Sequence, residues 1–184
     1  MSVSLPPDEH EVLSHYVGDA RQLSMEAFRE RHGDAFLVHE APIQTLKPVA
    51  RTKATVAVDT LAEEASTNAE PVIKLNFAVF PVRRTGRSPF PNFISVGRAK
   101  SNDVIVEDES VSKFHAFFRR AENGQFVLQD GGSKNGTHVD DEQVPDKTAG
   151  GPTVVESGMR VRFGNVEMTF LLAPEFCDLV KRSM

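Results

Sequence analysis

The fold class is decided by residues 159–171, MRVRFGNVEMTFL, near the carboxyl end of a chain of 184 residues. Beyond the middle of this stretch apolar and polar side chains alternate, so that Val166, Met168 and Phe170 share one face of an extended strand. Gly164 and Asn165 come just before this strand and are typical of the tight turn between two antiparallel strands. The stretch therefore predicts a β-hairpin with one buried face.

The same period of two extends back to about Lys74, in short apolar runs that turn residues separate. One of these turns, Asn123-Gly124, predicts a type I′ hairpin, in which both residues take a positive φ. No helical pattern lies between the runs, so the sequence predicts a mainly β fold, an antiparallel β-sandwich. Its seven candidate strands are residues 75–82, 93–96, 104–106, 116–120, 125–129, 159–163 and 166–171.

The first part of the chain has a different pattern. Residues 6–33 have the pattern of helices: two prolines precede an acidic first turn, Ser24 is a candidate N-cap for a second short helix, and Gly33 is a candidate stop. A brief strand, residues 36–38, follows. We expect a small N-terminal α/β appendage that packs on the rest of the chain or on another copy, because these elements bury little apolar surface alone. One face of the first helix would carry Val12, Leu13, Tyr16 and Val17.

Composition and charge divide the chain into parts. Residues 1–72 hold 6 basic and 12 acidic side chains, whereas residues 73–184 hold 15 and 14. Near the boundary the chain is rich in Thr, Ala, Ser and Glu with few large apolar side chains, which predicts a flexible linker. We therefore expect an N-terminal segment at 1–46, a linker at 47–72, the sandwich at 73–173 and a C-terminal tail at 174–184.

Composition also excludes several classes of protein. The net charge of −5 and the pI near 5.7 argue against nonspecific capture of nucleic acid. The single cysteine, Cys177, excludes a disulfide framework or a zinc site built on several thiolates and suits a reducing compartment. No window approaches the roughly 18 apolar residues of a membrane span, and residues 1–15 do not resemble a secretory signal. We expect a cytoplasmic protein without a metal, a cofactor, a nucleic-acid partner or a membrane partner.

Polar, glycine-containing segments lie at the strand junctions, at residues 97–103, 110–115 and 131–137. In a sandwich such segments gather at the ends, where loops present side chains from a rigid frame. Here they carry an arginine, lysines, hydroxyls and an asparagine beside backbone donors at glycines. This inventory suits a doubly charged ligand with several acceptor oxygens, and a phosphate group is the obvious candidate.

These segments also carry a specific resemblance, over about residues 75–172. The motifs are, in order, Gly97-Arg98, Asn102-Asp103, Val111-Ser112-Lys113-Phe114-His115, Asp130, Ser133-Lys134-Asn135-Gly136-Thr137, Gly158 and Phe163-Gly164. Their order and spacing resemble those of the forkhead-associated (FHA) domain, a family of phospho-motif binders. The resemblance implies a β-sandwich of about eleven strands that binds phosphothreonine peptides without catalysis.

The resemblance also implies roles for individual residues. Arg98 would hold phosphate oxygens, Ser112 would donate its hydroxyl and its backbone amide, and Lys113 would touch the phosphate. Lys134 would lie next to the phosphothreonine, and Asn135 would clamp the peptide main chain just after it. A planar guanidinium matches phosphate in a two-pronged way, and an amide side chain satisfies both a peptide N–H and a C=O. The residues that would support these loops are Gly97, His115, Gly136 and Thr137.

The sequence departs from the family pattern at two places. Asp140-Asp141 stand where members commonly have Asn-Gly, which weakens the case for a standard turn and places two negative charges near the loop end. Met159 replaces an acidic residue that often follows Gly158, a change we expect to be local.

The sequence gives only weak support to an enzyme or to a nucleic-acid-binding protein. Asp108, Ser112 and His115 resemble a catalytic triad only by proximity along the chain, and no Gly-x-Ser-x-Gly elbow is present. The basic run from Arg83 to Arg87 fits a solvated hairpin tip, and Phe117-Phe118 fits a core rather than a stacking platform. The sequence therefore predicts no enzyme.

The predicted function is that of a phosphothreonine-binding adaptor in Ser/Thr-kinase signalling. Its partners would be proteins phosphorylated on threonine, or its own linker in cis, where Thr60 has acidic neighbours. The alternative is a degenerate FHA domain that serves as a phosphate-independent assembly or scaffold module.

Overall fold

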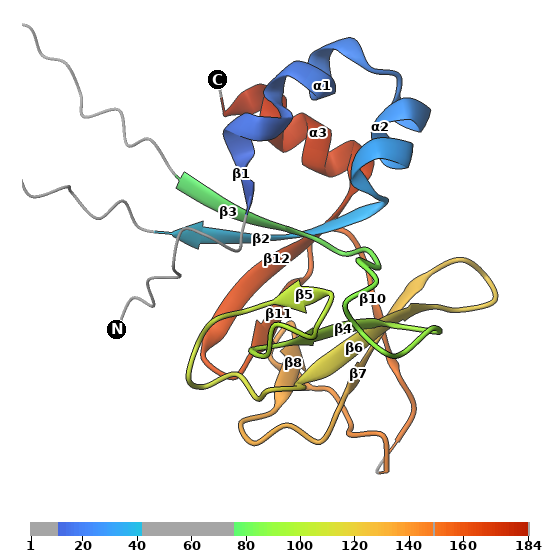
Figure 1. The fold of residues 1–184 in the computed structure, drawn as a ribbon, viewed down its shortest axis with the longest axis vertical. Coiled ribbons are helices and arrows are strands. Elements are labelled where there is room, and N and C mark those ends of the chain that lie inside the picture. The colour runs from blue at the N-terminus through green and yellow to red at the C-terminus, as the bar shows by residue number, and fades with distance from the viewer. Residues whose placement is uncertain (1–10, 42–75, 149, 184) are drawn as a thin grey trace, which may run out of the picture.

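The computed structural model describes residues 11–41, 76–148 and 150–183. In these residues twelve strands form two stacked sheets, and helices cover the outer face of the larger sheet (Figure 1). This confirms the predicted mainly β fold and its β-sandwich. The described part of the chain contains no helix long and apolar enough to cross a membrane.

The larger sheet has seven strands, and all its neighbouring strands are antiparallel. Its second and third strands pair Phe80 with Leu37, which in turn lies beside Phe170 of the next strand. In sheet order the strands are β1 (Glu11–Val12), β3 (Asn76–Pro81), β2 (Ala35–Ala41), β12 (Val166–Leu172), β11 (Arg160–Phe163), β8 (Thr137–Val139) and β9 (Glu142–Gln143).

The smaller sheet has five strands. Its pairs are antiparallel except β4 and β5, which run parallel. In sheet order the strands are β10 (Thr153–Val155), β7 (Phe126–Asp130), β6 (Ala116–Arg120), β4 (Ile94–Gly97) and β5 (Val104–Ile105).

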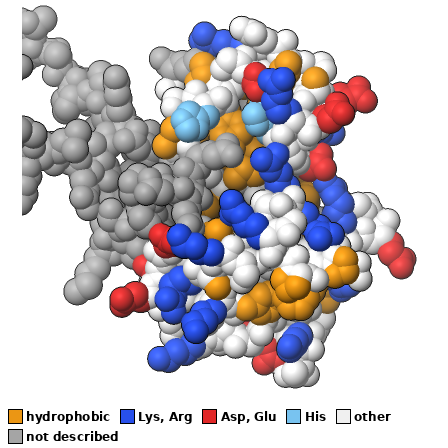
Figure 2. Space-filling model, viewed as in Figure 1, with side chains coloured by type: hydrophobic (Ala, Val, Ile, Leu, Met, Phe, Trp, Pro, Cys, Tyr) orange, Lys and Arg blue, Asp and Glu red, His pale blue; other side chains and the backbone are white. Residues whose placement is uncertain are grey.

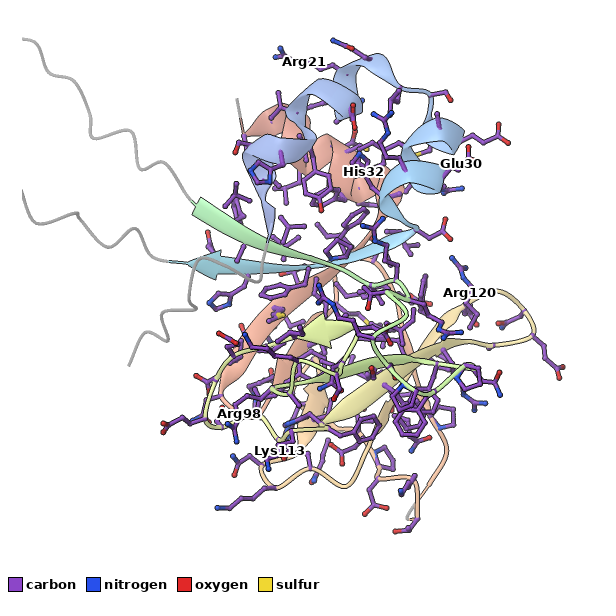
Figure 3. The ribbon with its side chains drawn as sticks, viewed as in Figure 1. Arg21, Glu30, His32, Arg98, Lys113 and Arg120 are labelled. Atoms are coloured by element: carbon purple, nitrogen blue, oxygen red, sulfur yellow. The ribbon has the colours of Figure 1, made fainter. Side chains whose placement is uncertain are left out.

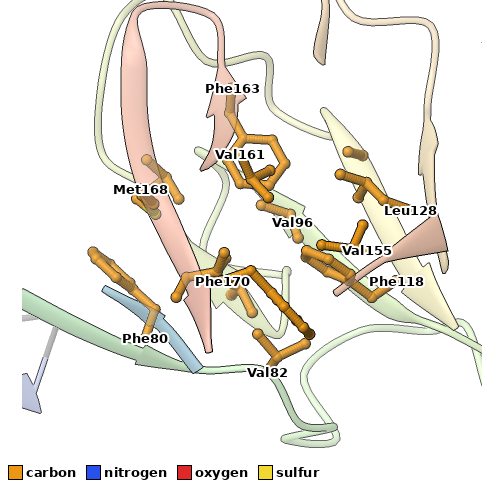
Figure 4. Packing of buried hydrophobic residues seen from close by; sticks show 14 of the residues in the cluster. Phe80, Val82, Val96, Phe118, Leu128, Val155, Val161, Phe163, Met168 and Phe170 are labelled. Carbon is orange, nitrogen blue, oxygen red and sulfur yellow. The ribbon is translucent and has the colours of Figure 1, made fainter. Parts of the chain in front are cut away.

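The main core lies between the two sheets, as Figure 4 shows. Phe118 of β6 stacks on Phe170 of β12 with ring centroids 5.8 Å apart, and meets Phe163 of β11 edge-on at 6.4 Å. All three rings are fully buried. Because each such ring contributes roughly 1.5–3 kcal/mol by leaving water, this contact fixes the sheets face to face.

A second core joins the helices to the outer face of β2, β3 and β12. Its aromatic side chains are Tyr16, Phe28, Phe36 and Phe176, and Phe36 stacks on Phe176 with centroids 4.0 Å apart. The helical elements are the 3-10 helix η1 (Leu13–Tyr16), α1 (Val17–Gln22), α2 (Met25–His32) and α3 (Ala173–Arg182).

The predicted helix signals are confirmed in part. Ser24 caps α2, since its Oγ accepts the Ala27 amide at 3.2 Å, and Gly33 ends the helix with a φ of 104°. The prediction of helix was wrong at Glu11–Val12, which form β1 and pair with β3. Residues 6–10 lie outside the described residues. The first backbone N–H groups of a helix have no partner within the helix, whereas pairing with the edge strand β3 gives the backbone of Glu11 and Val12 hydrogen-bond partners.

The sandwich extends beyond the boundaries predicted for it. Strand β2, within the segment assigned to the appendage, lies between β3 and β12 and buries Ala35 and Leu37 in the main core. The residues expected as a tail form most of α3, whose Phe176 and Cys177 are buried in the second core. The predicted linker, residues 47–72, lies outside the described residues.

The turns differ from expectation at two hairpins. Gly124 has a φ of 83°, but no positive φ occurs at Asn123, so the predicted type I′ turn is wrong there. The backbone amide of Ala121 instead donates to the Gln125 carbonyl, which closes a longer loop. Asp140 and Asp141, with φ of 46° and 71°, form the two-residue turn between β8 and β9.

Candidate functional site

Three loops meet at one end of the sandwich, at residues 97–103, 110–115 and 131–137. The Arg98 amide donates to the Ser112 carbonyl at 2.9 Å, which ties the first loop to the second. The Lys134 amide donates to the Ser112 hydroxyl at 3.1 Å, which ties the third loop to the second. The structure therefore brings all five predicted ligand-binding residues to the same loop cluster.

The Arg98 side chain is exposed but positioned. Its Nε donates to the Val111 carbonyl at 3.2 Å, which leaves the two terminal guanidinium nitrogens for an anion. Figure 3 shows Arg98 and Lys113 at the same lower corner of the sandwich. Both side chains are exposed, so their charges face solvent at that corner.

Ser112 has a narrower role than the sequence predicts. Its backbone amide donates to His115 Nδ1 at 3.0 Å, so this amide is already used inside the protein. Its hydroxyl oxygen accepts the Lys134 amide, while the hydroxyl proton can still be donated outward. Because the amide already has this internal partner, the hydroxyl is the available donor of Ser112.

His115 is fully buried beneath the loops. Because its Nδ1 accepts the Ser112 amide, its Nε2 carries the proton and donates to the Gly136 carbonyl at 3.1 Å. Burial lowers the pKa of His115 below its usual value of 6.5, although the Gly136 carbonyl and Asp130 oppose this shift. The neutral ring therefore links the second loop to the third.

Asp130 organises the third loop from below. One carboxylate oxygen accepts the Gly132 and Ser133 amides, and the other accepts the Ser133 and Thr137 hydroxyls at 2.7 and 2.6 Å. Burial raises the pKa of Asp130, but these hydrogen bonds outweigh it and the net pKa is lowered. The motif spacing includes Asp130 but does not predict this role. The following Gly-Gly-Ser, typical of an Asx turn, was the signal for it.

Asn102 connects the first and second loops, another role that the sequence analysis left open. Its Nδ2 donates to the Ala99 carbonyl at 2.8 Å and to the Lys113 carbonyl at 2.6 Å. Gly97 permits this close approach, because a Cβ at that position would lie 2.5 Å from the Lys113 carbonyl oxygen. Glycine is therefore required at position 97 because a side chain would collide with the second loop, not because of an unusual φ.

Asn135 lies at the edge of the third loop. Its Nδ2 donates to the Ser110 carbonyl at 2.7 Å, which holds the side chain in place and leaves Oδ1 to accept from a ligand. Gly136 follows with a φ of 76°, and its carbonyl also accepts the Gly164 amide. Beside these residues lies a groove of about 610 Å³, lined by Lys134, Asn135, His138 and Gln143 among others.

The geometry does not form a catalytic triad. The two ring nitrogens of His115 bond to the Ser112 amide and the Gly136 carbonyl, so neither activates the Ser112 hydroxyl. The Asp108 carboxylate instead accepts the amide and hydroxyl of Ser110. No group of three or more His, Cys, Asp or Glu side chains suited to a metal ion occurs among the described residues.

The two aspartates at the β8–β9 turn lie away from the loop cluster. Asp140 Oδ1 accepts the Arg160 amide at 2.8 Å, and the Asp141 carboxylate pairs with the Arg160 guanidinium at 2.7 Å. Arg160 begins β11, whereas Phe163 at the other end of that strand pairs with Thr137 beside the loops. Their charges are therefore directed to Arg160 and not to the candidate site.

Comparisons with known proteins match the centre of the chain. Residues 94–164 match the family model of the FHA domain. The glycogen accumulation regulator GarA of Mycolicibacterium smegmatis is 37% identical over 84 residues, which are 46% of this chain and 49% of GarA. The oxoglutarate dehydrogenase inhibitor of Corynebacterium diphtheriae is 35% identical over 80 residues, 44% of this chain and 51% of that protein. The chain thus spans about half the length of these curated relatives.

Among solved structures, a chain described as Mycobacterium tuberculosis EmbR in complex with a low-affinity phosphopeptide is 26% identical, with a TM-score of 0.38. The match covers 44% of this chain and 20% of that chain. A chain described as the Mycobacterium tuberculosis Rv1747 FHA-1 is 27% identical with a TM-score of 0.37, over 44% of this chain and 79% of that one.

Proposed function

We propose that residues 94–164, which match the family model of the FHA domain, form a domain that binds phosphothreonine peptides. In this proposal the protein is a non-catalytic, cytoplasmic adaptor that recognises partners phosphorylated by a Ser/Thr kinase. The names of the curated relatives, a glycogen accumulation regulator and an oxoglutarate dehydrogenase inhibitor, support a regulatory role.

The observation that carries the proposal is the link between the three loops through the Ser112 hydroxyl. The Ser112 hydroxyl accepts the Lys134 amide, and the Ser112 backbone carbonyl accepts the Arg98 amide. Cationic residues from the two other loops are therefore held around Ser112. A preorganised set of donors loses little freedom on binding and favours a ligand with several acceptor oxygens. A phosphate dianion has the charge and the tetrahedral oxygens to use them.

In the proposed complex each residue has a separate task. The Arg98 guanidinium takes two phosphate oxygens, the Ser112 hydroxyl donates to a third, and the Lys113 and Lys134 ammonium groups neutralise the remaining charge. Asn135 accepts from the ligand backbone through Oδ1. Supporting the loops from behind are Gly97, His115, Gly136 and Thr137.

The test is a phosphothreonine peptide array probed with the full chain and with two arginine variants. Arg98→Ala removes charge-assisted hydrogen bonds of roughly 1.5–3 kcal/mol each, so affinity should fall between about tenfold and more than a hundredfold. The matched control is Arg182→Ala, which removes an exposed arginine of α3 and should leave affinity within about twofold. Unchanged binding by Arg98→Ala refutes the assignment.

A second arm of the array distinguishes phosphate recognition from a scaffold role. Phosphatase treatment should abolish binding, and Asp in place of phosphothreonine should bind poorly, since a planar monoanion lacks the charge and shape of phosphate. A partner that is retained after phosphatase treatment and by Arg98→Ala would replace this proposal with a phosphate-independent assembly module.

The linker in cis is a further candidate ligand of the same site. Thr60 lies outside the described residues. Ala41 and Asn76 are register partners in β2 and β3, so the segment between them starts and ends at neighbouring positions of one sheet. Such a tether raises the effective concentration of any residue it carries. Phosphorylation of Thr60 that leaves the NMR shifts of Arg98 and Ser112 unchanged would exclude this contact.

A further inference from the structure

Four phenylalanine rings lie together outside both buried cores of the protein. Phe90 stacks on Phe93 with centroids 4.7 Å apart, and Phe93 approaches Phe117 at 4.5 Å. Phe114 lies 5.6 Å from Phe90 and 6.3 Å from Phe117. None of the four belongs to the core between the sheets or to the core beneath the helices. We call these residues, Phe90, Phe93, Phe114 and Phe117, the aromatic patch.

The alternation of β6 directs this patch outward. Ala116 and Phe118 face the main core, so Phe117 between them points to the outer face of the five-stranded sheet. The prediction that both Phe117 and Phe118 are core residues holds for Phe118 alone. Phe90 is 41% exposed, so part of the patch faces solvent.

The charged residues next to the patch in the chain are cationic. Lys113 directly precedes Phe114, and Arg119 follows Phe117 by two residues on the same face of β6. Arg84 donates to the Pro91 carbonyl, between Phe90 and Phe93 in the chain. In Figure 2 a hydrophobic patch lies in the lower half of the molecule with lysine and arginine side chains around it.

The patch is continuous with the candidate phosphate site. Phe114 follows Lys113 in the second loop, and its ring lies against Gly131, where a Cβ would be 2.5 Å from the ring. Gly131 opens the third loop, which carries Lys134 and Asn135. A chain that leaves the phosphate site across this contact reaches the rings without crossing the rest of the sandwich.

We propose that the aromatic patch is a second docking surface, which binds an acidic segment with large apolar side chains next to the phosphothreonine in the partner. It rests on the proposed function only because it places the acidic segment and the phosphothreonine on the same partner. The apolar side chains would cover the exposed Phe90 ring and the half-buried rings beside it, while carboxylates would pair with Arg119. A second copy of this chain is disfavoured, because it would place the same cations opposite each other.

The test uses synthetic peptides built on one phosphothreonine peptide selected from the array. One series adds a flanking segment of Asp, Glu, Trp and Leu on either side of the core sequence. A second series replaces the acids by amides, and a third replaces the apolar residues by Ser. On the wild-type chain the acidic and apolar extension should raise affinity about tenfold or more, and each altered extension should lose most of that gain.

Two variants locate the gain on the patch. Phe90→Ser and Arg119→Glu should abolish the gain from the extension and leave the core peptide within about twofold. The matched controls are Val154→Ser, an equally exposed apolar residue on β10, and Arg182→Glu on α3, which should both retain the gain. Because Phe90, Arg119, Val154 and Arg182 are exposed, these variants are expected to fold.

The outcomes separate this proposal from the proposed function. If the core peptide depends on Arg98 but no extension adds affinity, or if the gain is retained by Phe90→Ser, the docking surface is overturned and phosphate binding stands. If no core peptide binds but the unphosphorylated acidic extension binds through Phe90, phosphate binding fails and the docking surface stands. A dimer, or binding of an oligothymidylate, that is lost in Phe90→Ser would also overturn the proposal.

Discussion

The loop end of the sandwich and the helical cap over β2, β3 and β12 are held by different kinds of contact. At the loop end the fixed points are buried polar groups: Asn102, His115, Asp130 and Thr137. In the cap they are aromatic rings that pack on one another: Tyr16, Phe28, Phe36 and Phe176. Hydrogen bonds are directional, whereas apolar burial depends mainly on area and fit.

The difference indicates a division of labour: the contacts of the loop end position side chains, and those of the cap stabilise the fold. Under the proposed function, the loop end requires exact placement of a few exposed side chains, and satisfied buried polar groups provide it. The cap covers a sheet face that would otherwise expose its apolar side chains, and large rings cover it efficiently. Substitutions in the cap should therefore change stability alone, whereas substitutions at the loop end should change binding as well as stability and its pH dependence.

The largest effect is expected from Phe176→Ala in the cap. The ring is fully buried and stacks on Phe36, so its removal should lower the free energy of unfolding by about 3–5 kcal/mol. Denaturant unfolding measures this loss. Leu179→Ala, at a half-buried position of the same helix, is the control and should lose less. Equal losses, or a phosphopeptide affinity that falls in the folded fraction of Phe176→Ala, would contradict the division of labour.

The next effect is expected from Asp130→Asn at the loop end. The carboxylate accepts four hydrogen bonds, and a neutral amide accepts with one oxygen only, so stability should fall by about 2 kcal/mol. Phosphopeptide affinity should fall at least about tenfold, because the third loop loses its anchor. Calorimetric titration measures the affinity, with the exposed Asp141→Asn as the control. A variant that loses stability but binds normally would show that the anchor does not position the ligand-binding residues.

Both regions show how far the sequence predicts the fold. Alternation found seven strands, because each has one face toward the main core. It missed β8, β9 and β10, which have two or three residues each and too few positions to show a period. It missed the central place of β2 because strand order depends on contacts far along the chain. Phe36 and Leu37 face different cores, which makes β2 apolar on both sides.

The sequence predicts the exposed residues of the candidate site more directly than the residues that support its loops. Arg98, Ser112 and Asn135 stand in motifs with specific spacing, and the structure brings their loops together. The supporting roles of Asn102 and Asp130 depend on where the loop backbones come close, which spacing alone does not give. The use of the Ser112 amide by His115 has the same origin, since it depends on the tautomer and orientation of a buried ring.

A third test compares the pH dependence of the two regions. Burial lowers the pKa of His115, so below pH 6.5 the unfolded chain binds a proton that the folded chain does not. Stability should therefore fall as the pH drops from about 7 to 5, by at most about 1.4 kcal/mol per pH unit for this group. Unfolding measured at several pH values tests this.

The matched variants for the pH test are His115→Asn and His15→Asn. His115→Asn should give a shallower slope of stability against pH than the wild-type chain. The remaining slope would come from His138, whose pKa burial also lowers. His15→Asn, which replaces an exposed histidine of η1 outside the loop end, is the control. An unchanged slope in His115→Asn would mean that the buried ring does not contribute to the pH dependence of the loop end.

The smallest effect concerns the β8–β9 turn, where the sequence departs from the family pattern without losing the turn. Asp140 and Asp141 both take a positive φ, a region that costs L-residues roughly 1 kcal/mol each and that Asn and Gly enter more easily. Asp140→Asn with Asp141→Gly should therefore raise stability by about 0.5–1 kcal/mol, measured by denaturant unfolding. Asn at position 140 can still accept the Arg160 amide, and the lost exposed pair between Asp141 and Arg160 is worth little.

Because this turn lies at the opposite end of β11 from the loops, phosphopeptide affinity should not change. A fall in stability would mean that the pair with Arg160 outweighs the backbone strain.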